Sequence, residues 1–298
     1  MRNSRVKRSH IVPKFYLRGF CMDRDERVWV GDLRLQQAFI GYIRDVGVHG
    51  SFYEAGAGKH EDDLEKRLAN IESDAAPHLR SFLRANCQIG PELTRFIAWL
   101  AARTYWLRRK VDEEFPAYLA AYLAANRESL EQEIDSEFRL FRFEHVRTGA
   151  VKEATLKDAL AQVNDPDWRM QVTQDQHLDA IRLQAYLFQS IHFPKLNWVR
   201  AKAPNELAFI TSDRPVCWSS MNANVEDSPS ALNNPDIQLT LPLNLSVALV
   251  AGHGQEMRVW TVDEINYQTC LGAERFVYGH SKEVVERWMR QRSNDRAH

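Results

Sequence analysis

The chain has 298 residues, of which 44% are hydrophobic, 27% are charged and 10% are aromatic. This composition is too apolar for an intrinsically disordered chain, and charged residues interrupt every apolar run well before the ~18 residues of a membrane span. The 39 basic and 40 acidic residues give a formal net charge of −1, which carries no overall signal for nucleic acid or an anionic membrane. We therefore expect a soluble globular protein with no membrane association.

The cysteines and the N-terminus indicate the compartment. No two cysteines form a CxxC pair, so a structural zinc site or a thioredoxin-type motif is not expected. Buried, reduced thiols are the expected state of all four, Cys21, Cys87, Cys217 and Cys270. The basic N-terminus lacks the apolar segment of a secretory signal, so we expect a cytoplasmic protein.

The N-terminal part predicts one strand. Polar and apolar residues alternate over Arg27–Asp32, with Val28 and Val30 on one side. A short basic and aromatic connection to Phe52 and Tyr53 is expected to follow. We expect this strand to join a sheet formed by the later part of the chain.

The section from about residue 59 to residue 193 is predicted to be helical. Apolar residues recur in steps of three and four from Leu64 to Phe82, and Pro77 is expected to kink or restart this helix. A second helix is expected to begin at Pro91 and to continue past Leu107. It should end before Pro116. Further helices are predicted over residues 117–147, 151–163 and 175–190.

The period changes to two from Asn197 onward, which favours strands. The predicted strands are Trp198–Lys202, Leu207–Ser212, Ile237–Leu241, Ser246–Ala251, Met257–Thr261 and Arg275–Tyr278. Two helices are predicted between and after them, Val262–Gly272 and Ser281–Gln291, the first with Thr261 and Glu264 in capping-box spacing. The polar stretch 219–237 is expected to be a mobile loop, a lid or both.

Strands grouped after helices, without regular alternation, predict an α+β fold with an antiparallel sheet and a large central helical section. We expect residues 1–298 to form a single domain. In that domain, the helical section of about residues 59–193 is inserted between an N-terminal arm with its strand and a C-terminal β-rich part.

Charge is unevenly distributed along the chain. Residues 1–20 contain six basic and no acidic residues, whereas the stretch from His60 to Asp74 is rich in acids. The basic arm also carries large apolar side chains, so it should dock on the core and bring His10 with it. A docked neutral imidazole can act as a general base or a metal ligand. Alternatively, His10 satisfies a backbone group or caps a helix.

Two carboxylates stand out on the acidic helix. Glu65 and Glu72 lie on one stripe beside the apolar face, where converging oxygens could bind a divalent cation. A salt-bridged helix edge is the alternative. Arg103 lies on the apolar face of the next helix, and a buried guanidinium needs either a carboxylate partner or an anionic ligand.

A polar cluster follows the predicted strand that ends at Ser212. A strand end before Asp213 and Pro215 is a rigid place to present a carboxylate or a hydroxyl group. The same residues could instead form a turn that closes the strand.

Several of these motifs, in this order, resemble a bacterial domain-of-unknown-function family, number 4238. The likeness covers about residues 9–280. It implies no particular activity, but the motif residues of the family map here onto His10, Glu65, Glu72, Arg103 and Asp213. It rests on the segments His10-x-x-Pro-x-Phe-Tyr-Leu-Arg18-x-Phe20, Phe52-Tyr53, the helix with Glu65 and Glu72, Arg103-Thr104, Thr211-Ser-Asp-x-Pro-Val216, Pro242-Leu243, Asn266 and Phe276-Val-Tyr278.

Two classes of function fit these residues. In the first, the protein is a metal-assisted hydrolase, possibly a nuclease, with Mg²⁺ or Mn²⁺ held by Glu65, Glu72 and Asp213 and with His10 as general base. Its substrate would be nucleic acid or a small anion, bound by the side chains of Tyr16, Tyr53, Arg103 and Ser212. In the second, the same polar residues form a buried network, and the protein is a non-catalytic module that binds a ligand or another protein. A purely structural network without a ligand, in which His10 and Arg103 lock the N-terminal arm, is the remaining alternative.

Overall fold

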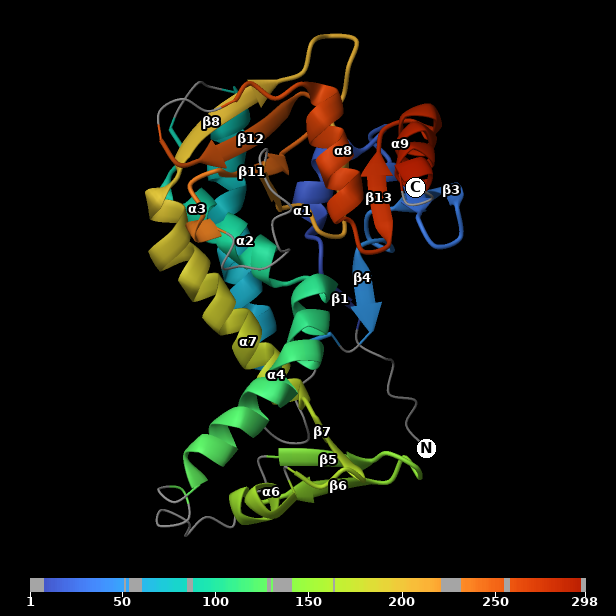
Figure 1. Cartoon of the computed structure of the whole chain (residues 1–298). Coiled ribbons are helices and arrows are strands. Elements are labelled where there is room, and N and C mark those ends of the chain that lie inside the picture. Colours follow the sequence, from blue (N-terminus) through green and yellow to red (C-terminus); the bar gives the residue numbers. More distant parts are fainter. Residues whose placement is uncertain are drawn as a thin grey trace. The chain divides into compact units, whose positions relative to one another are not determined.

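The computed structural model describes residues 8–50, 52–53, 61–84, 88–127, 130, 141–162, 164–220, 232–254 and 258–295. Contacts divide the chain into two compact units (Figure 1). Unit 1 comprises Met1–Tyr53, Glu61–Thr104 and Arg182–His298, and unit 2 comprises Glu54–His60 and Tyr105–Ile181. Both units combine helices with antiparallel strands, which confirms the predicted α+β class.

The N-terminal arm of unit 1 forms short elements. Strand β1 (Arg8–His10) pairs antiparallel with β4 (Val48–Gly50). It leads into helix α1 (Lys14–Leu17) and the 3₁₀ helix η1 (Arg18–Phe20). Three large side chains of this arm, Tyr16, Leu17 and Phe20, are fully buried, which confirms that it docks on the core.

The first four-stranded sheet joins both ends of the chain. Its order is β3 (Gln37–Tyr42), β2 (Arg27–Asp32), β13 (Phe276–Gly279) and β9 (Thr211–Ser212). The predicted strand β2 is confirmed, and its pairing with β13 confirms that it joins a sheet of the later chain. Strand β3 was not predicted, because its large apolar side chains do not alternate with polar ones.

The second four-stranded sheet has the order β10 (Cys217–Ser220), β11 (Ile237–Pro242), β12 (Val247–Gly252) and β8 (Asn197–Lys202). Three of the predicted strands, at β8, β11 and β12, are confirmed. The prediction of a strand over Leu207–Ser212 is wrong except at its last two residues, and residues 258–261 form no strand. Most of the predicted loop or lid at 219–237 lies outside the residues that the structure describes.

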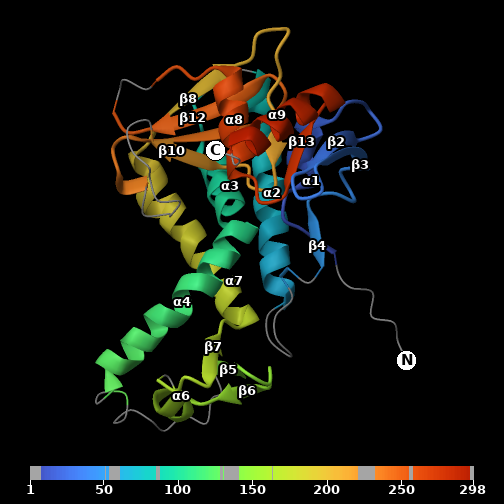
Figure 2. The ribbon, with the colours of Figure 1, turned by 45° about the vertical axis from the view of Figure 1, so that its right-hand side comes forward.

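Two long helices of unit 1 lie side by side in both ribbon views (Figures 1 and 2). Helix α2 (Glu61–Arg84) continues through Pro77, so the predicted restart at this proline is wrong. Helix α3 (Pro91–Ala102) begins at the predicted proline but ends at Ala102, not beyond Leu107. The break occurs because Arg103 leaves the helical conformation, with φ −87° and ψ 60°.

Unit 2 contains strands where only helices were predicted. Helix α4 (Tyr105–Ala125) runs through Pro116, and the predicted helix over 117–147 is wrong from residue 141 on. A three-stranded sheet has the order β6 (Val151–Ala154), β5 (Phe141–His145) and β7 (Trp168–Gln171). Of the predicted helix over 151–163, only the last part is helical, as α6 (Leu156–Gln162).

The predicted helix over 175–190 is confirmed as α7 (Gln174–Leu187), which continues into a π-helix, η2 (Phe188–His192), and a short 3₁₀ helix, η3 (Phe193–Lys195). None of the helices in the described part of the chain is long and apolar enough to cross a membrane.

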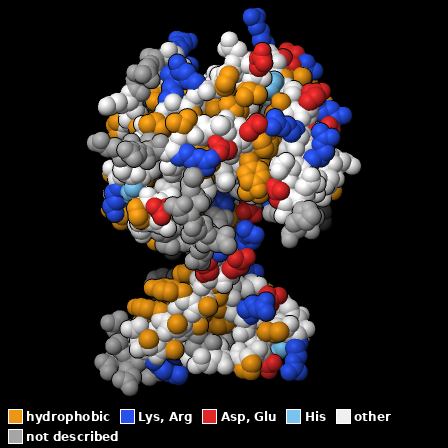
Figure 3. Space-filling view, turned by 45° about the horizontal axis from the view of Figure 1, so that its top comes forward, with side chains coloured by type: hydrophobic (Ala, Val, Ile, Leu, Met, Phe, Trp, Pro, Cys, Tyr) orange, Lys and Arg blue, Asp and Glu red, His pale blue; other side chains and the backbone are white. Residues whose placement is uncertain are grey.

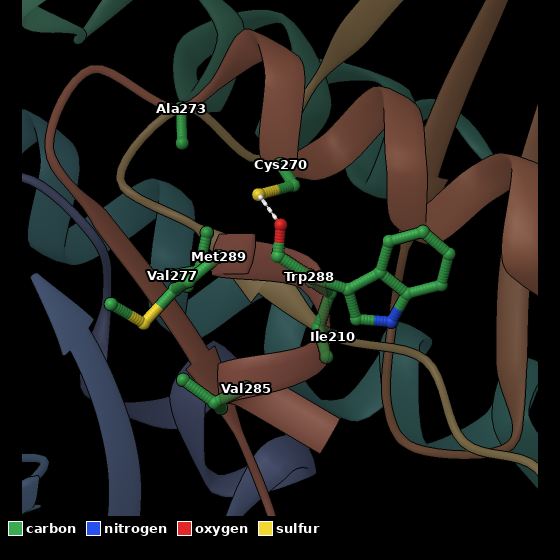
Figure 4. Close-up of a cluster of buried hydrophobic side chains, with 7 residues drawn as sticks. All are labelled: Ile210, Cys270, Ala273, Val277, Val285, Trp288 and Met289. Atoms are coloured by element: carbon green, nitrogen blue, oxygen red, sulfur yellow. Dashed lines mark hydrogen bonds between the residues drawn. The ribbon is translucent and has the colours of Figure 1, made fainter. Parts of the chain in front are cut away.

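The C-terminal helices close one core of unit 1. Helix α8 (Val262–Gly272) has the predicted bounds, and Thr261 and Glu264 form the predicted capping box. Helix α9 (Lys282–Asp295) packs on β13 and β2. Figure 4 shows the apolar side chains between these elements and the hydrogen bond from the Cys270 thiol to the carbonyl of Trp288. The core residues drawn there are Ile210, Cys270, Ala273, Val277, Val285, Trp288 and Met289.

Candidate functional site

The N-terminal arm is tied to the acidic face of α2. The hydroxyl of Ser9 donates a hydrogen bond to Oε1 of Glu65 at 2.7 Å. Further along the arm, the rings of Phe15 and Phe96 contact each other with centroids 5.0 Å apart. The basic arm and the acidic helix, which are opposite in charge and separate in sequence, therefore meet in the fold.

Arg103 and Glu72 form an ion pair behind this arm. The Nη1 atom of Arg103 lies 2.7 Å from Oε1 of Glu72, with side-chain exposures of 1% and 26%. Arg103 is the residue that follows the last turn of α3, at the break before α4. The break therefore positions its guanidinium beside Glu72. The buried charge is therefore paired with a carboxylate through Nη1, which is one of the two options that the sequence left open.

His10 and Tyr53 complete the cluster. The Tyr53 hydroxyl donates to the backbone carbonyl of His10 at 3.4 Å, and burial raises the pKa of this phenol to about 12. Burial, and then the charge of Lys14, lower the pKa of His10, so its imidazole is neutral at pH 7. The Nε2 atom of His10 is buried and has no hydrogen-bond partner within the described part of the chain.

Asp213 serves a different site. Its Oδ1 accepts from the backbone N–H of Glu274, and its Oδ2 accepts from those of Arg275 and Phe276, at 2.8–2.9 Å. Burial raises the pKa of Asp213 to about 6, although these donors stabilise its charged form. The carboxylate therefore closes the start of β13. Asp213 therefore forms neither the predicted turn nor a freely presented carboxylate, because its donors lie in a distant segment. The turn after the strand is formed by Ser212, whose hydroxyl oxygen accepts from the backbone N–H of Arg214.

The predicted convergence of three carboxylates is therefore not found. Among the residues that the structure describes, no three His, Cys, Asp or Glu side chains are placed to hold a metal ion. Glu65 and Glu72 lie on one helix, whereas Asp213 is occupied by backbone donors elsewhere. The shared Mg²⁺ or Mn²⁺ site of Glu65, Glu72 and Asp213 is a prediction that the geometry does not support.

Two predicted substrate-binding residues are part of the core. Tyr16 is fully buried, and its hydroxyl donates to the carbonyl of Pro242 at 2.6 Å and lies 2.7 Å from Oγ1 of Thr211. The buried hydroxyl of Ser212 donates to the carbonyl of Arg214 at 2.8 Å. Both side chains hold the fold together and are not accessible to a substrate.

An open cavity of about 430 Å³ lies between the arm and α2. One wall comes from β1, α1 and η1 of the arm, and the other comes from a stripe of mostly small residues on α2. The lining residues are His10, Lys14, Phe15, Arg18, Ala69, Glu72, Ser73 and Ala76. This volume falls in the range of small-molecule sites. His10 and Glu72 are thus the predicted site residues that line this cavity.

Sequence reasoning missed the basic side chains of this cavity. Lys14 and Arg18 are four residues apart, so they come one turn apart once the arm is helical. This spacing was visible in the sequence, but the helix has only four residues and shows no apolar periodicity of its own. Arg18 also pairs with Glu26, and both of these side chains are exposed.

Three cysteines can be checked against the prediction of free thiols. Cys217 and Cys270 are free and buried, which confirms it, and Cys21 is free but only partly buried. Cys87 lies outside the described residues.

Comparison with known proteins gives one match. A family model described as "Protein of unknown function (DUF4238)" matches residues 8–283, nearly the whole chain. No curated protein and no solved structure matches the chain.

Proposed function

Since the chain belongs to the DUF4238 family of proteins of unknown function, we propose its function from its own site: it is a module that binds a small anionic ligand in the cavity between α1 and α2. The hypothesis of a metal-assisted hydrolase or nuclease stays a prediction. It loses its main argument, because the three carboxylates do not converge.

The observation that carries the proposal is the charge balance of the cavity. Arg103 compensates the negative charge of Glu72, and Glu26 compensates the positive charge of Arg18. Lys14 is exposed and forms no ion pair with any residue that the structure describes. With neutral His10 on the same wall, the cavity keeps an excess positive charge that a phosphate or carboxylate group would neutralise.

The remaining lining groups favour a ligand with a neutral polar part. Glu72 and Ser73 line the cavity beside His10, whose Nε2 atom is buried. A ligand hydroxyl or amine can bond to such groups, and the ring of Phe15 offers an apolar contact. A nucleoside monophosphate combines an anionic phosphate, polar hydroxyl and amine groups and an aromatic base.

The face drawn in Figure 3 does not show the charge pattern of a nucleic-acid-binding surface. On the face that it shows, acidic and basic side chains are interspersed among the coloured residues, with no continuous basic tract. Nucleic-acid-binding surfaces concentrate basic residues on one face or along one groove.

Thermal shift and calorimetry with three probes test the proposal: adenosine monophosphate, inorganic phosphate and uncharged adenosine. We expect the monophosphate to bind and to raise the melting temperature, phosphate to bind more weakly, and adenosine not to bind. Acetate, run beside phosphate, distinguishes a carboxylate from a phosphate preference.

Two variants locate the binding. Lys14→Ala and Arg18→Ala should each weaken binding at least about tenfold, and because both side chains are exposed their folding should be unaffected. Lys202→Ala, at an exposed lysine of β8, is the matched control. Unchanged affinity in the two cavity variants, or no binding of any anionic probe by the wild type, would overturn the proposal.

A further inference from the structure

Strand β3 lies at the edge of the first sheet. The order β3-β2-β13-β9 leaves its outer side without a strand partner among the described residues. Both ribbon views show β3 as the outermost strand of this sheet (Figures 1 and 2). An open edge is a template for pairing with another chain unless it is protected.

The hydrogen bonds that extend the strands of this sheet show which groups of β3 point outward. The backbone N–H of Ile43 donates to Glu26, and that of Leu33 donates to Arg275 on the other side of β2. Hydrogen-bonded positions alternate along an antiparallel ladder, so Gln37, Phe39 and Gly41 bond to β2. The N–H and C=O groups of the intervening residues, Ala38, Ile40 and Tyr42, face away from it.

The edge lacks the usual protection. From Gln37 to Tyr42 it contains neither a charged residue nor a proline, the common devices that keep edge strands apart. Phe39 and Ile40 project from opposite faces of the strand, and each is 44% exposed. Apolar contact is therefore available on both sides of the open edge.

One end of the strand is already closed. The carbonyl of Tyr42 accepts from the N–H groups of Asp45 at 2.8 Å and Val46 at 3.1 Å. The guanidinium of Arg44 lies over the Tyr42 ring, 4.9 Å from its centroid. Among the residues that the structure describes, the outward groups that remain open for pairing belong to Ala38 and Ile40.

We propose that a second copy of this chain pairs with β3, antiparallel and about a two-fold axis at Phe39. An axis perpendicular to the sheet keeps each side chain on its own face, so Phe39 lies opposite Phe39 of the second copy. Ala38 of each copy then lies opposite Ile40 of the other, and these two pairs form four backbone hydrogen bonds.

The side chains fit this register. Each Ile40 lies beside an Ala38 of the other copy, so a large side chain meets a small one twice. The two Phe39 rings meet at a non-hydrogen-bonded position, where paired backbones come closest. A register centred on Ile40 would instead require the Tyr42 carbonyl, which Asp45 and Val46 already occupy. The two sheets would join through β3 and its copy.

Sedimentation equilibrium tests the pairing. An interface of one strand pair is small, so we expect reversible dimers with a dissociation constant in the micromolar range, on the order of 10–100 µM. Ile40→Pro removes an outward N–H but none of the bonds to β2, so it should weaken dimerisation at least about tenfold without unfolding the chain. Ile40→Val, which keeps the N–H, is the control and should still dimerise.

Cysteine cross-linking tests the register. Under mild oxidation, Phe39→Cys should form a disulfide-linked dimer, because residues facing each other at this position have Cα atoms about 4.5 Å apart. Ile40→Cys should not cross-link, since its copies would be too far apart, and the wild type shows the background of the native cysteines. A wild type that stays monomeric, or a dimer that Ile40→Pro leaves intact, overturns the proposal. Cross-linking at position 40 but not at 39 overturns the register.

Discussion

Arg103 donates a hydrogen bond of 2.7 Å to Glu72, from the residue after α3 to the side of α2. The guanidinium is 1% exposed, whereas the carboxylate is 26% exposed and lines the cavity beside α1. This pair therefore joins the core of unit 1 to the candidate ligand site.

The first prediction concerns this pair. Arg103→Ala should lower the free energy of unfolding by about 3 kcal/mol or more, because it leaves a partly buried carboxylate unpaired and opens a cavity. Glu72→Gln should also destabilise the protein, by leaving the buried guanidinium without a counter-charge. Chemical denaturation measures both values. Lys282→Ala, in an exposed pair with Glu286, is the control and should change little. An unchanged stability of Arg103→Ala would reject a structural role for the pair.

The second prediction concerns Asp213. Both of its carboxylate oxygens accept backbone N–H bonds, so an amide in either orientation would point an NH₂ group at a donor. Asp213→Asn should therefore cost about 1–3 kcal/mol at pH 7, measured by urea denaturation. Asp25→Asn, at a carboxylate that is 76% exposed, should be nearly neutral. Equal stability of the two variants would contradict the assigned role of Asp213.

The third prediction concerns the pH dependence of unit 2. The Nε of Arg108 lies 3.1 Å from Nδ1 of His177, and the His177 Nε2 lies 2.8 Å from Asp112. Burial and the Arg108 charge lower the pKa of His177 to about 4. In the unfolded chain, the His177 imidazole has an ordinary pKa of about 6.5 and binds a proton more readily than in the folded chain. The stability that depends on neutral His177 is therefore lost as the pH falls from about 6.5 to about 4.

Nuclear magnetic resonance titration should find the His177 imidazole neutral down to about pH 4. His177→Gln keeps an acceptor but cannot titrate, so the difference in unfolding free energy between wild type and variant should shift by as much as about 3 kcal/mol over this range. A difference that stays constant from pH 7 to pH 4, or titration near the ordinary pKa, would show that the imidazole is not held neutral.

The fourth prediction concerns the start of α8. The Thr261 side chain accepts from the backbone N–H of Glu264, and Glu264 bonds back to the N–H of Thr261. Thr261→Ala should cost about 1 kcal/mol, whereas Thr261→Ser should retain most of the stability because it keeps the accepting oxygen. Thermal or chemical denaturation distinguishes the two. Equal losses in both variants would mean that the hydroxyl does not cap the helix.

Local patterns predicted some elements well and failed at others for identifiable reasons. The β2 strand and the α8 helix have their own alternation or capping signal, and both were predicted with the observed bounds. The three strands of unit 2 were missed, since Phe143 and its neighbours are ordered by pairing between segments that are separate in sequence. The end of α3 was missed because Arg103 continues the apolar periodicity although its backbone leaves the helix.

The amino-acid sequence alone determined the family, the α+β class, the docking of the basic arm and the need of Arg103 for a carboxylate or an anion. These follow from local composition, periodicity and the cost of burying apolar surface or charge, which each segment carries by itself. Only the tertiary structure decided that Glu72 pairs with Arg103, that Asp213 binds backbone N–H groups, and that Lys14 and Arg18 share a cavity with His10. Those outcomes depend on which distant segments pack together. The same residue types could form a metal site if they converged. The packing instead gives each of them its own partner.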